Sequence, residues 1–179
     1  MFKRANASFE AAREKMTDVP DSVPETGESY FFKGPGFEND ETIALCIEAI
    51  IGWAVALEAF VNLIWTSHPK TKYIDERKSG NTIEKLRKLY KAEELSYGDL
   101  VWRCSICDLF EMRNYLVHYK ELVVYVGFSF AAKFQHDFAE KNMQKIQEDV
   151  VCALKDMSVV FDIDAGFVDG NYDHLVYRY

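Results

Sequence analysis

The sequence predicts an all-α fold, an antiparallel bundle of four to five helices with an irregular N-terminal arm and a short C-terminal tail. The chain has 179 residues, enough for one domain with a sizeable core that needs no disulfide or metal. Hydrophobic residues make up 49% of the chain and charged residues 28%, which is typical of a globular protein. Apolar residues recur at helical spacing in several stretches joined by modest loops, and this pattern favours a helical bundle.

Residues 1–39 are expected to form the arm, which is partly irregular. Residues 6–16 have the pattern of a short helix. Proline and glycine interrupt regular elements, and the segment 17–39 contains six of them: Pro20, Pro24, Pro35, Gly27, Gly34 and Gly36. This segment is therefore predicted to be an extended arm without regular secondary structure.

Residues 40–166 are expected to hold the bundle. Asn39 or Asp40 offers an N-cap, and a long apolar run follows from Ile43 to Trp65, up to the helix-ending step His68-Pro69. Three polar side chains interrupt the run: Glu48, Glu58 and Asn62. The length of the run invites a transmembrane assignment, but such residues make insertion costly. A central helix covered by its neighbours or by a second subunit is favoured, and no membrane partner is expected.

Two capping signals predict further helix starts. Asn81–Glu84 opens a short helix, and Ser96–Asp99 opens a longer one. An apolar stripe then traces a final long helix that ends near Gly166. Residues 122–130 are β-branched and aromatic, which favours an extended segment. The tail, residues 167–179, lies outside the bundle.

Charge is distributed unevenly along the chain. The net charge of −8 argues against a protein that coats DNA non-specifically, because such binding depends on neutralising phosphates. Between Pro69 and Ala92, however, eight lysines and arginines stand against three acidic residues. Arg87 and Lys88 in this stretch are candidates for guiding RNA. A solvated loop and helix that are simply rich in lysine explain the stretch equally well.

The N-terminal residues lack the apolar region of a secretory signal, so a cytoplasmic protein with free cysteines is expected. Cys104 and Cys107 have the spacing of a metal-binding pair, but the sequence has no second pair. Two buried cysteines on a core face account for them, and neither a metal nor a cofactor is predicted. The sequence also lacks a phosphate-binding glycine loop and a serine nucleophile elbow.

Arg113 and His118 form the strongest candidate for chemistry. Histidine exchanges a proton near neutral pH, so His118 suits a general base or acid. The planar guanidinium of Arg113 suits a phosphoryl group and can stabilise charge that gathers there. Five residues advance a helix by one full turn plus about 140°, so the two side chains cannot share one helical face. Either the helix frays by His118, or the site is assembled from two subunits.

The segment Arg113-Asn114-Tyr115-Leu116-Val117-His118 resembles the signature of the HEPN superfamily, in which an arginine precedes a histidine by a few residues and a polar residue follows the arginine. The resemblance covers roughly residues 40–163 and includes Ala56–Asn62, which is similar to the first long helix of many HEPN proteins. It implies a homodimer whose paired motifs face each other. It further implies a metal-independent endoribonuclease of the toxin or antiviral-defence type, with RNA as substrate and a 2′,3′-cyclic phosphate as product. Arg113, Asn114 and His118 would be its catalytic residues.

Four further residues are candidates for supporting roles. Glu58 and Asn62 lie on one face of an otherwise apolar helix, so Glu58 is expected to meet Arg113 or another basic residue, as a positioning residue or as a plain buried ion pair. Tyr119 is expected to line the site and stack on a base, with Lys120 beside it. Some HEPN toxins carry a tyrosine two residues after the histidine, which a partner nucleotidyltransferase modifies. Lys120 holds that position here, which puts this form of neutralisation in doubt.

Two functions remain open at this stage. The alternative to the ribonuclease is a non-catalytic HEPN-like module that binds RNA or nucleotides, or that acts as a dimeric interaction protein. The titratable His118 favours the enzyme, and the acidic net charge favours the module. In a purely structural interpretation, Arg113 pairs with Glu111 or Asp108 and His118 caps a helix end. The resemblance also allows an antitoxin or another regulatory partner protein.

Overall fold

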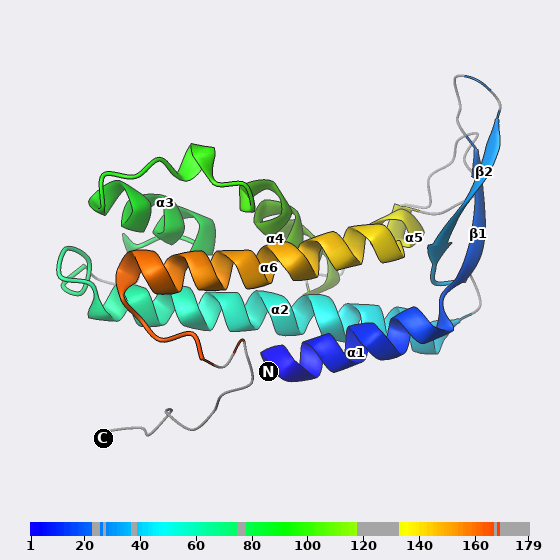
Figure 1. Cartoon of the computed structure of the whole chain (residues 1–179), viewed down its shortest axis with the longest axis horizontal. Helices are drawn as coiled ribbons and strands as arrows, with labels where there is room; N and C mark the ends of the chain where they lie inside the picture. Colours follow the sequence, from blue (N-terminus) through cyan, green and yellow to red (C-terminus); the bar gives the residue numbers. More distant parts are fainter. Residues whose placement is uncertain are drawn as a thin grey trace.

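A computed structural model of the chain describes residues 1–22, 26, 28–36, 39–74, 78–117, 133–166 and 168. The elements follow in the order α1 (Phe2–Lys15), β1 (Thr17–Ser22), β2 (Ser29–Gly34), α2 (Asp40–Ser67), α3 (Thr82–Ala92), the 3-10 turn η2 (Tyr97–Asp99), α4 (Arg103–Val117), α5 (Lys133–Asp137) and α6 (Glu140–Phe161). Helices α1, α2 and α6 lie along the long axis of the molecule (Figure 1). Helices α2 and α6 run in the same direction, and α1 runs in the opposite one.

The prediction of an all-α fold is wrong, because the segment expected to be an irregular arm contains an antiparallel β-hairpin. Strands β1 and β2 pair along their whole length, so the fold combines helices with a small sheet. The described residues also contain six α-helices rather than four to five. Pro20 does not interrupt β1, because each strand of a two-stranded sheet has an open edge where a missing N–H costs nothing. Pro20 is exposed, while Val19 and Asp21 beside it are buried.

The hairpin is held against α5 by contacts between residues far apart in the sequence. The His136 Nε2 atom lies 2.7 Å from Oδ2 of the buried Asp21. The His136 ring stacks on Phe32, with 4.9 Å between the ring centroids. The side chain of Gln135 donates to the Pro35 carbonyl at 3.2 Å. These contacts fix the hairpin at the end of the helical layer where α5 lies (Figure 1).

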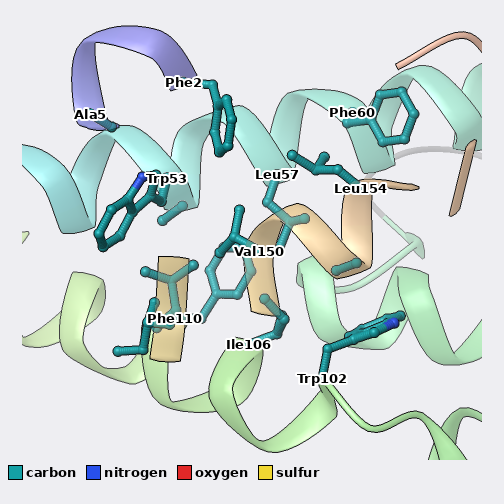
Figure 2. Packing of buried hydrophobic residues seen from close by; sticks show 14 of the residues in the cluster. Phe2, Ala5, Trp53, Leu57, Phe60, Trp102, Ile106, Phe110, Val150 and Leu154 are labelled. Carbon is teal, nitrogen blue, oxygen red and sulfur yellow. The ribbon is translucent and has the colours of Figure 1, made fainter. Parts of the chain in front are cut away.

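Helix α1 belongs to the same core as the later helices. Its buried face packs on α2, and near Ala5 the two backbones come so close that a Cβ on Gly52 would lie 2.7 Å from the Ala5 Cβ. The Trp53 indole N–H donates to Asn6 at 2.7 Å, and its ring meets Phe9 edge to face at 5.6 Å. Residues before position 40 therefore contribute to one continuous core, part of which is drawn in Figure 2.

Helix α2 is the central helix that the sequence predicts. Its N-cap is Asn39, whose side chain accepts from the Thr42 N–H at 3.1 Å. It ends at Ser67, because the following His68 precedes a proline and is extended, with φ −70° and ψ 129°. Its length and composition alone would let it cross a membrane. In the fold, α1, α3, α4 and α6 contact it, as is usual for the core helix of a soluble protein.

The later helices follow the predicted pattern with shifted ends. The Asn81 side chain caps α3 by accepting from the Glu84 N–H at 3.0 Å, as predicted. The second capping signal is different, because Ser96 makes no side-chain cap and leads into η2, so that α4 begins only at Arg103. Helix α6 ends at Phe161 rather than near Gly166, since Asp162 adopts a left-handed conformation with φ 50°. Residues 122–130, predicted to be extended, lie outside the described residues.

An aromatic cluster joins α3, η2 and α6. The Tyr90 hydroxyl and the Trp102 indole N–H both donate to Oδ2 of Asp156, at 2.5 Å and 3.3 Å. Burial is the main cause that raises the pKa of Tyr90, and the hydrogen bond to Asp156 adds to it. Tyr97 packs edge to face against both rings. The cluster therefore connects α3 and η2 to α6.

Candidate functional site

Arg113 lies near the C-terminal end of α4 and faces α2. Its Nη2 atom is 3.7 Å from Oε2 of Glu58, and its Nη1 donates to the Asn114 side-chain oxygen at 3.0 Å. The side chains of Arg113 and Glu58 are 29% and 39% exposed, so the pair lies at the edge of the core and not inside it. The contact expected between Glu58 and Arg113 is therefore present. The carboxylates proposed in the purely structural interpretation, Glu111 and Asp108, are not the partners that Arg113 uses.

A second polar pair lies one helical turn along α2. The Asn62 side-chain oxygen accepts from Lys85 Nζ of α3 at 2.7 Å. Lys85 is only 6% exposed, which is unusual for a lysine. Glu58 and Asn62 are four residues apart, so they lie on one face of α2 and anchor cations from two different helices. The interrupted apolar run of the sequence thus marks the place where α3 and α4 present charge to α2.

Glu58, Arg113 and Lys85 line one groove of about 400 Å³ between α2, α3 and α4. Phe110, which is 8% exposed, supplies an apolar wall. Three cations and three carboxylates line the groove, so its lining carries no net formal charge. The lining residues are Glu58, Gly80, Asn81, Thr82, Ile83, Glu84, Lys85, Arg87, Cys107, Phe110, Glu111, Arg113 and Asn114.

The other residues of the predicted motif lie beyond the end of α4. Helix α4 is described to Val117, and His118, Tyr119 and Lys120 lie outside the described residues. Arg113 and Asn114 both border the groove, whereas the position of the histidine relative to them is not described. Within the motif, the structure therefore describes the surroundings of Arg113 and Asn114, which border the groove.

Arg87 and Lys88 are neighbours in the sequence but point to different places. Arg87 lines the groove, with its guanidinium 5.9 Å from the centre of the Tyr97 ring. Burial, followed by the effect of Cys107, raises the pKa of Tyr97, so its ring stays uncharged beneath that guanidinium. Lys88 donates instead to the carbonyls of Ser79 at 2.8 Å and Lys78 at 3.4 Å. Of the two, Arg87 borders the groove, and Lys88 secures the loop before α3.

Because Arg87 and Lys88 make different contacts, substituting each of them gives two variants that lose the same charge at different places. If the basic stretch guides RNA, Arg87→Gln weakens RNA binding and lowers the slope of log affinity against log salt by about one, because one phosphate contact is lost. Lys88→Gln removes the same charge but is expected to leave that slope unchanged and to lower the melting temperature slightly. Binding titrations at several salt concentrations check both. An unchanged slope in Arg87→Gln would favour the other interpretation, in which the basic stretch is simply a solvated surface rich in lysine.

Sequence reasoning missed Lys85 and Phe110 as groove residues. A signal for Lys85 was present, because it stands on the buried stripe of α3 that also contains Thr82, Leu86 and Leu89. A lysine at an apolar position of an amphipathic helix indicates a special partner. Phe110 carried no comparable signal, because its spacing fits any core residue of α4.

The cysteines of α4 do not lie on a core face, as the sequence interpretation had them. Cys104 is exposed and Cys107 is half-buried at the groove, so that interpretation is wrong. Cys104 and Cys107 border two different pockets, the second of which is the groove. Within the described ranges, no group of three or more histidines, cysteines or acidic residues is arranged to hold a metal ion.

No protein-family model, curated protein or solved structure matches the chain. The resemblance to HEPN proteins accordingly rests on the residues of the motif and on their place in the sequence. The functional inference rests on the chemistry of the groove.

Proposed function

We propose that the chain is a metal-independent endoribonuclease of the toxin or antiviral-defence type, similar to HEPN ribonucleases. The observation that carries the proposal is the placement of Arg113. Its guanidinium is held by Glu58 and Asn114 at a groove that also contains Lys85 and Arg87. The arginine stands five positions before His118, a residue type suited to moving protons at neutral pH. A fixed cation beside a proton-transfer group is the combination that phosphodiester cleavage needs.

The proposed reaction uses the ribose 2′-hydroxyl of the RNA as nucleophile. The 2′-oxygen attacks the adjacent phosphorus and its proton passes to a base, while the bond from phosphorus to the 5′-oxygen breaks and that oxygen takes up a proton. His118 acts as the base or as the acid. Arg113 stabilises the charge that gathers on the non-bridging phosphate oxygens, and Asn114 orients Arg113 or the RNA backbone. Glu58 is a positioning residue that limits the orientations of Arg113.

The purified protein incubated with total RNA in EDTA provides the test. Cleavage is expected to proceed, because histidine and arginine supply the proton transfer and the charge stabilisation. The products are expected to carry 2′,3′-cyclic phosphate and 5′-hydroxyl ends, which end-specific enzymatic labelling distinguishes from other termini. A His118→Ala protein, prepared in parallel, controls for contaminating ribonuclease. Equal cleavage by the wild type and His118→Ala would contradict the ribonuclease assignment.

We further propose that the protein is cytoplasmic and works as a homodimer, with an antitoxin or regulatory protein as a further partner. A stripe of apolar residues on α2 that keeps accessible surface supports the dimer. Ile47, Ile51 and Val55 are half-buried at four-residue intervals, and Leu63 further along the helix is 49% exposed. Accessible apolar surface along a helix favours association with a second subunit.

Light scattering at micromolar concentration is expected to give the mass of a dimer. Leu63→Lys places a charge on the exposed apolar surface in the C-terminal half of α2 and is expected to shift the protein to a monomer without unfolding it. Val159→Lys, at a position on α6 that is 82% exposed, is the control and is expected to remain dimeric. A monomeric wild-type protein would count against both the dimer and a site assembled from two subunits.

One observation favours the alternative, a binding module without catalysis. Glu58 pairs with the Arg113 guanidinium, which a bound phosphate would need as its own partner. The cations that line the groove are also matched by an equal number of carboxylates. A module that binds a nucleotide or a protein would tolerate this balance. Binding of RNA that remains intact in the presence of the wild-type protein would select this alternative.

A further inference from the structure

The alternation of hydrogen bonds in the β-hairpin shows which backbone groups each of its two edges presents. Pro20 of β1 has no N–H, so the pair that it forms with Phe31 of β2 cannot exchange two backbone hydrogen bonds. The Ser22 N–H donates to the side chain of the adjacent Asp21 at 2.8 Å, and Ser22 has the same phase as Pro20. Both observations indicate that the N–H and C=O of Phe31 point away from β1.

Strand β2 therefore carries a row of outward backbone groups. Hydrogen-bonded pairs alternate along an antiparallel ladder, so Tyr30 and Phe32 bond to β1. Ser29, Phe31 and Lys33 direct their N–H and C=O groups to the other side. In the part of the chain that the structure describes, no third strand pairs with this edge. The Phe31 and Lys33 side chains are 68% and 56% exposed. Such a row of groups is a template for another extended strand.

A second copy of β2 complements this edge when a two-fold axis passes through Phe31. The two copies of Phe31 then exchange both of their outward hydrogen bonds, and Ser29 of each copy faces Lys33 of the other. This register uses all three outward residues of both strands, whereas an axis through Tyr30 or Phe32 leaves one of the three unpaired. The two lysines lie at opposite ends of the pairing, so like charges do not meet.

We propose that the open edge of β2 binds β2 of a second copy of this chain, which joins two hairpins into one four-stranded antiparallel sheet. The two exposed Phe31 rings then lie opposite each other on the outer face of the sheet. The edge of β1 is less suited to pairing because Pro20 offers no N–H. The hairpin lies at the end of the helical layer (Figure 1). Its edge is a different surface from the apolar stripe on α2, so this inference does not depend on the ribonuclease or on the α2 contact.

A crosslinking experiment tests the pairing and its register. Ser29→Cys and Lys33→Cys are prepared separately in a protein that also carries Cys104→Ser and Cys152→Ser, because these two native cysteines are exposed. In the proposed register, position 29 of one copy faces position 33 of the other with about 5.5 Å between Cα atoms. Equal positions of the two copies are about 13 Å apart along the strand. A short bifunctional maleimide is expected to link the two variants in a mixture and to link neither variant to itself.

Phe31→Pro and Phe31→Ala separate the contribution of the backbone from that of the ring. Both variants lose the ring, but only Phe31→Pro loses the outward N–H. Pro20 shows that the hairpin accepts a proline at a position of this kind. Two hydrogen bonds between the copies are lost, so Phe31→Pro is expected to associate about tenfold more weakly than Phe31→Ala. Sedimentation velocity at several concentrations measures this difference in a Leu63→Lys background, which removes the proposed α2 contact.

Amide hydrogen exchange shows whether the hairpin is intact and whether its edge is open. The N–H groups of Tyr30 and Phe32 point toward β1, so they are expected to be protected in the wild type and in both variants at every concentration. The Phe31 N–H of the wild type is expected to exchange freely in dilute protein and to become protected in concentrated protein. Protection in dilute protein would mean that the same chain already covers the edge, and it would overturn the proposal.

Two further results would also overturn it. One is the absence of crosslinks in the mixture, or crosslinks that form as readily within each single variant as in the mixture. The other is equal association of Phe31→Pro and Phe31→Ala while the Tyr30 and Phe32 N–H groups remain protected. None of these measurements uses RNA, so a protein that cleaves no RNA but gives the expected crosslinks rejects the ribonuclease and supports the hairpin contact.

Discussion

Arg113→Ala and His118→Ala are each expected to reduce kcat for RNA cleavage by about a hundredfold or more, the usual loss for a group that acts on the transition state. Arg113 is proposed to meet the negative charge that grows as the 2′-oxygen attacks, and His118 is proposed to move the proton. Binding of uncleaved RNA is expected to fall much less, particularly for His118→Ala, because that side chain contributes mainly after binding. Single-turnover cleavage together with a binding titration separates the two effects.

Three controls define this result. The pH profile of the wild type is expected to show a limb near the ordinary histidine pKa of about 6.5. Glu58→Gln keeps the shape of the partner of Arg113 but removes its charge, so it is expected to cause a smaller loss of kcat than Arg113→Ala. Circular dichroism and light scattering should show the helical content and the mass of the wild type for all variants. Wild-type cleavage by His118→Ala would remove the basis of the assignment, and cleavage that requires a metal but is lost in both alanine variants would keep the residues and change the mechanism.

Trp53→Ala is expected to lower the free energy of unfolding by about 3 to 5 kcal/mol, the usual cost of removing a large buried aromatic side chain. Trp53 is fully buried and joins α1 to α2 through Phe9 and Asn6. The loss should appear in urea denaturation as a lower midpoint. It also tests whether the first helix is part of the core, because a detached arm would not depend on Trp53.

Two companion variants divide the effect of Trp53→Ala. Asn6→Ala leaves the indole N–H without its described acceptor, and it is expected to cost about 1 to 3 kcal/mol. Val159→Ala, on the exposed side of α6, is expected to change stability by no more than about 0.5 kcal/mol. If Asn6→Ala and Trp53→Ala were both as mild as Val159→Ala, α1 would not be docked as described.

The helices could be predicted because their signals are local. Asn39 and Asn81 cap α2 and α3 through side chains that reach only three residues ahead, so sequence spacing was sufficient. His68 ends α2 for an equally local reason, the steric restriction imposed by the proline that follows. Ser96 misled the prediction, because the same spacing also suits a 3-10 turn.

The β-hairpin could not be predicted because what stabilises it is distant in the sequence. Its prolines and glycines indicate a break in helical structure but do not say what the chain does instead. Asp21 is buried against His136, and Pro35 accepts from Gln135, about a hundred residues further along. An isolated two-stranded hairpin is marginal in water, so its stability depends on this docking.

For the candidate site, the sequence by itself determined the chemistry of the residues: an arginine and a histidine five positions apart, and two polar residues one turn apart on an apolar helix. Tertiary structure decided which of these meet. Packing brought Glu58 to Arg113 and Asn62 to Lys85, and it directed Lys88 away from Arg87. The physical reason is that residue type and helical period are properties of a short stretch of chain. The partner of a side chain depends on how whole helices pack, which is decided by the burial of the complete core.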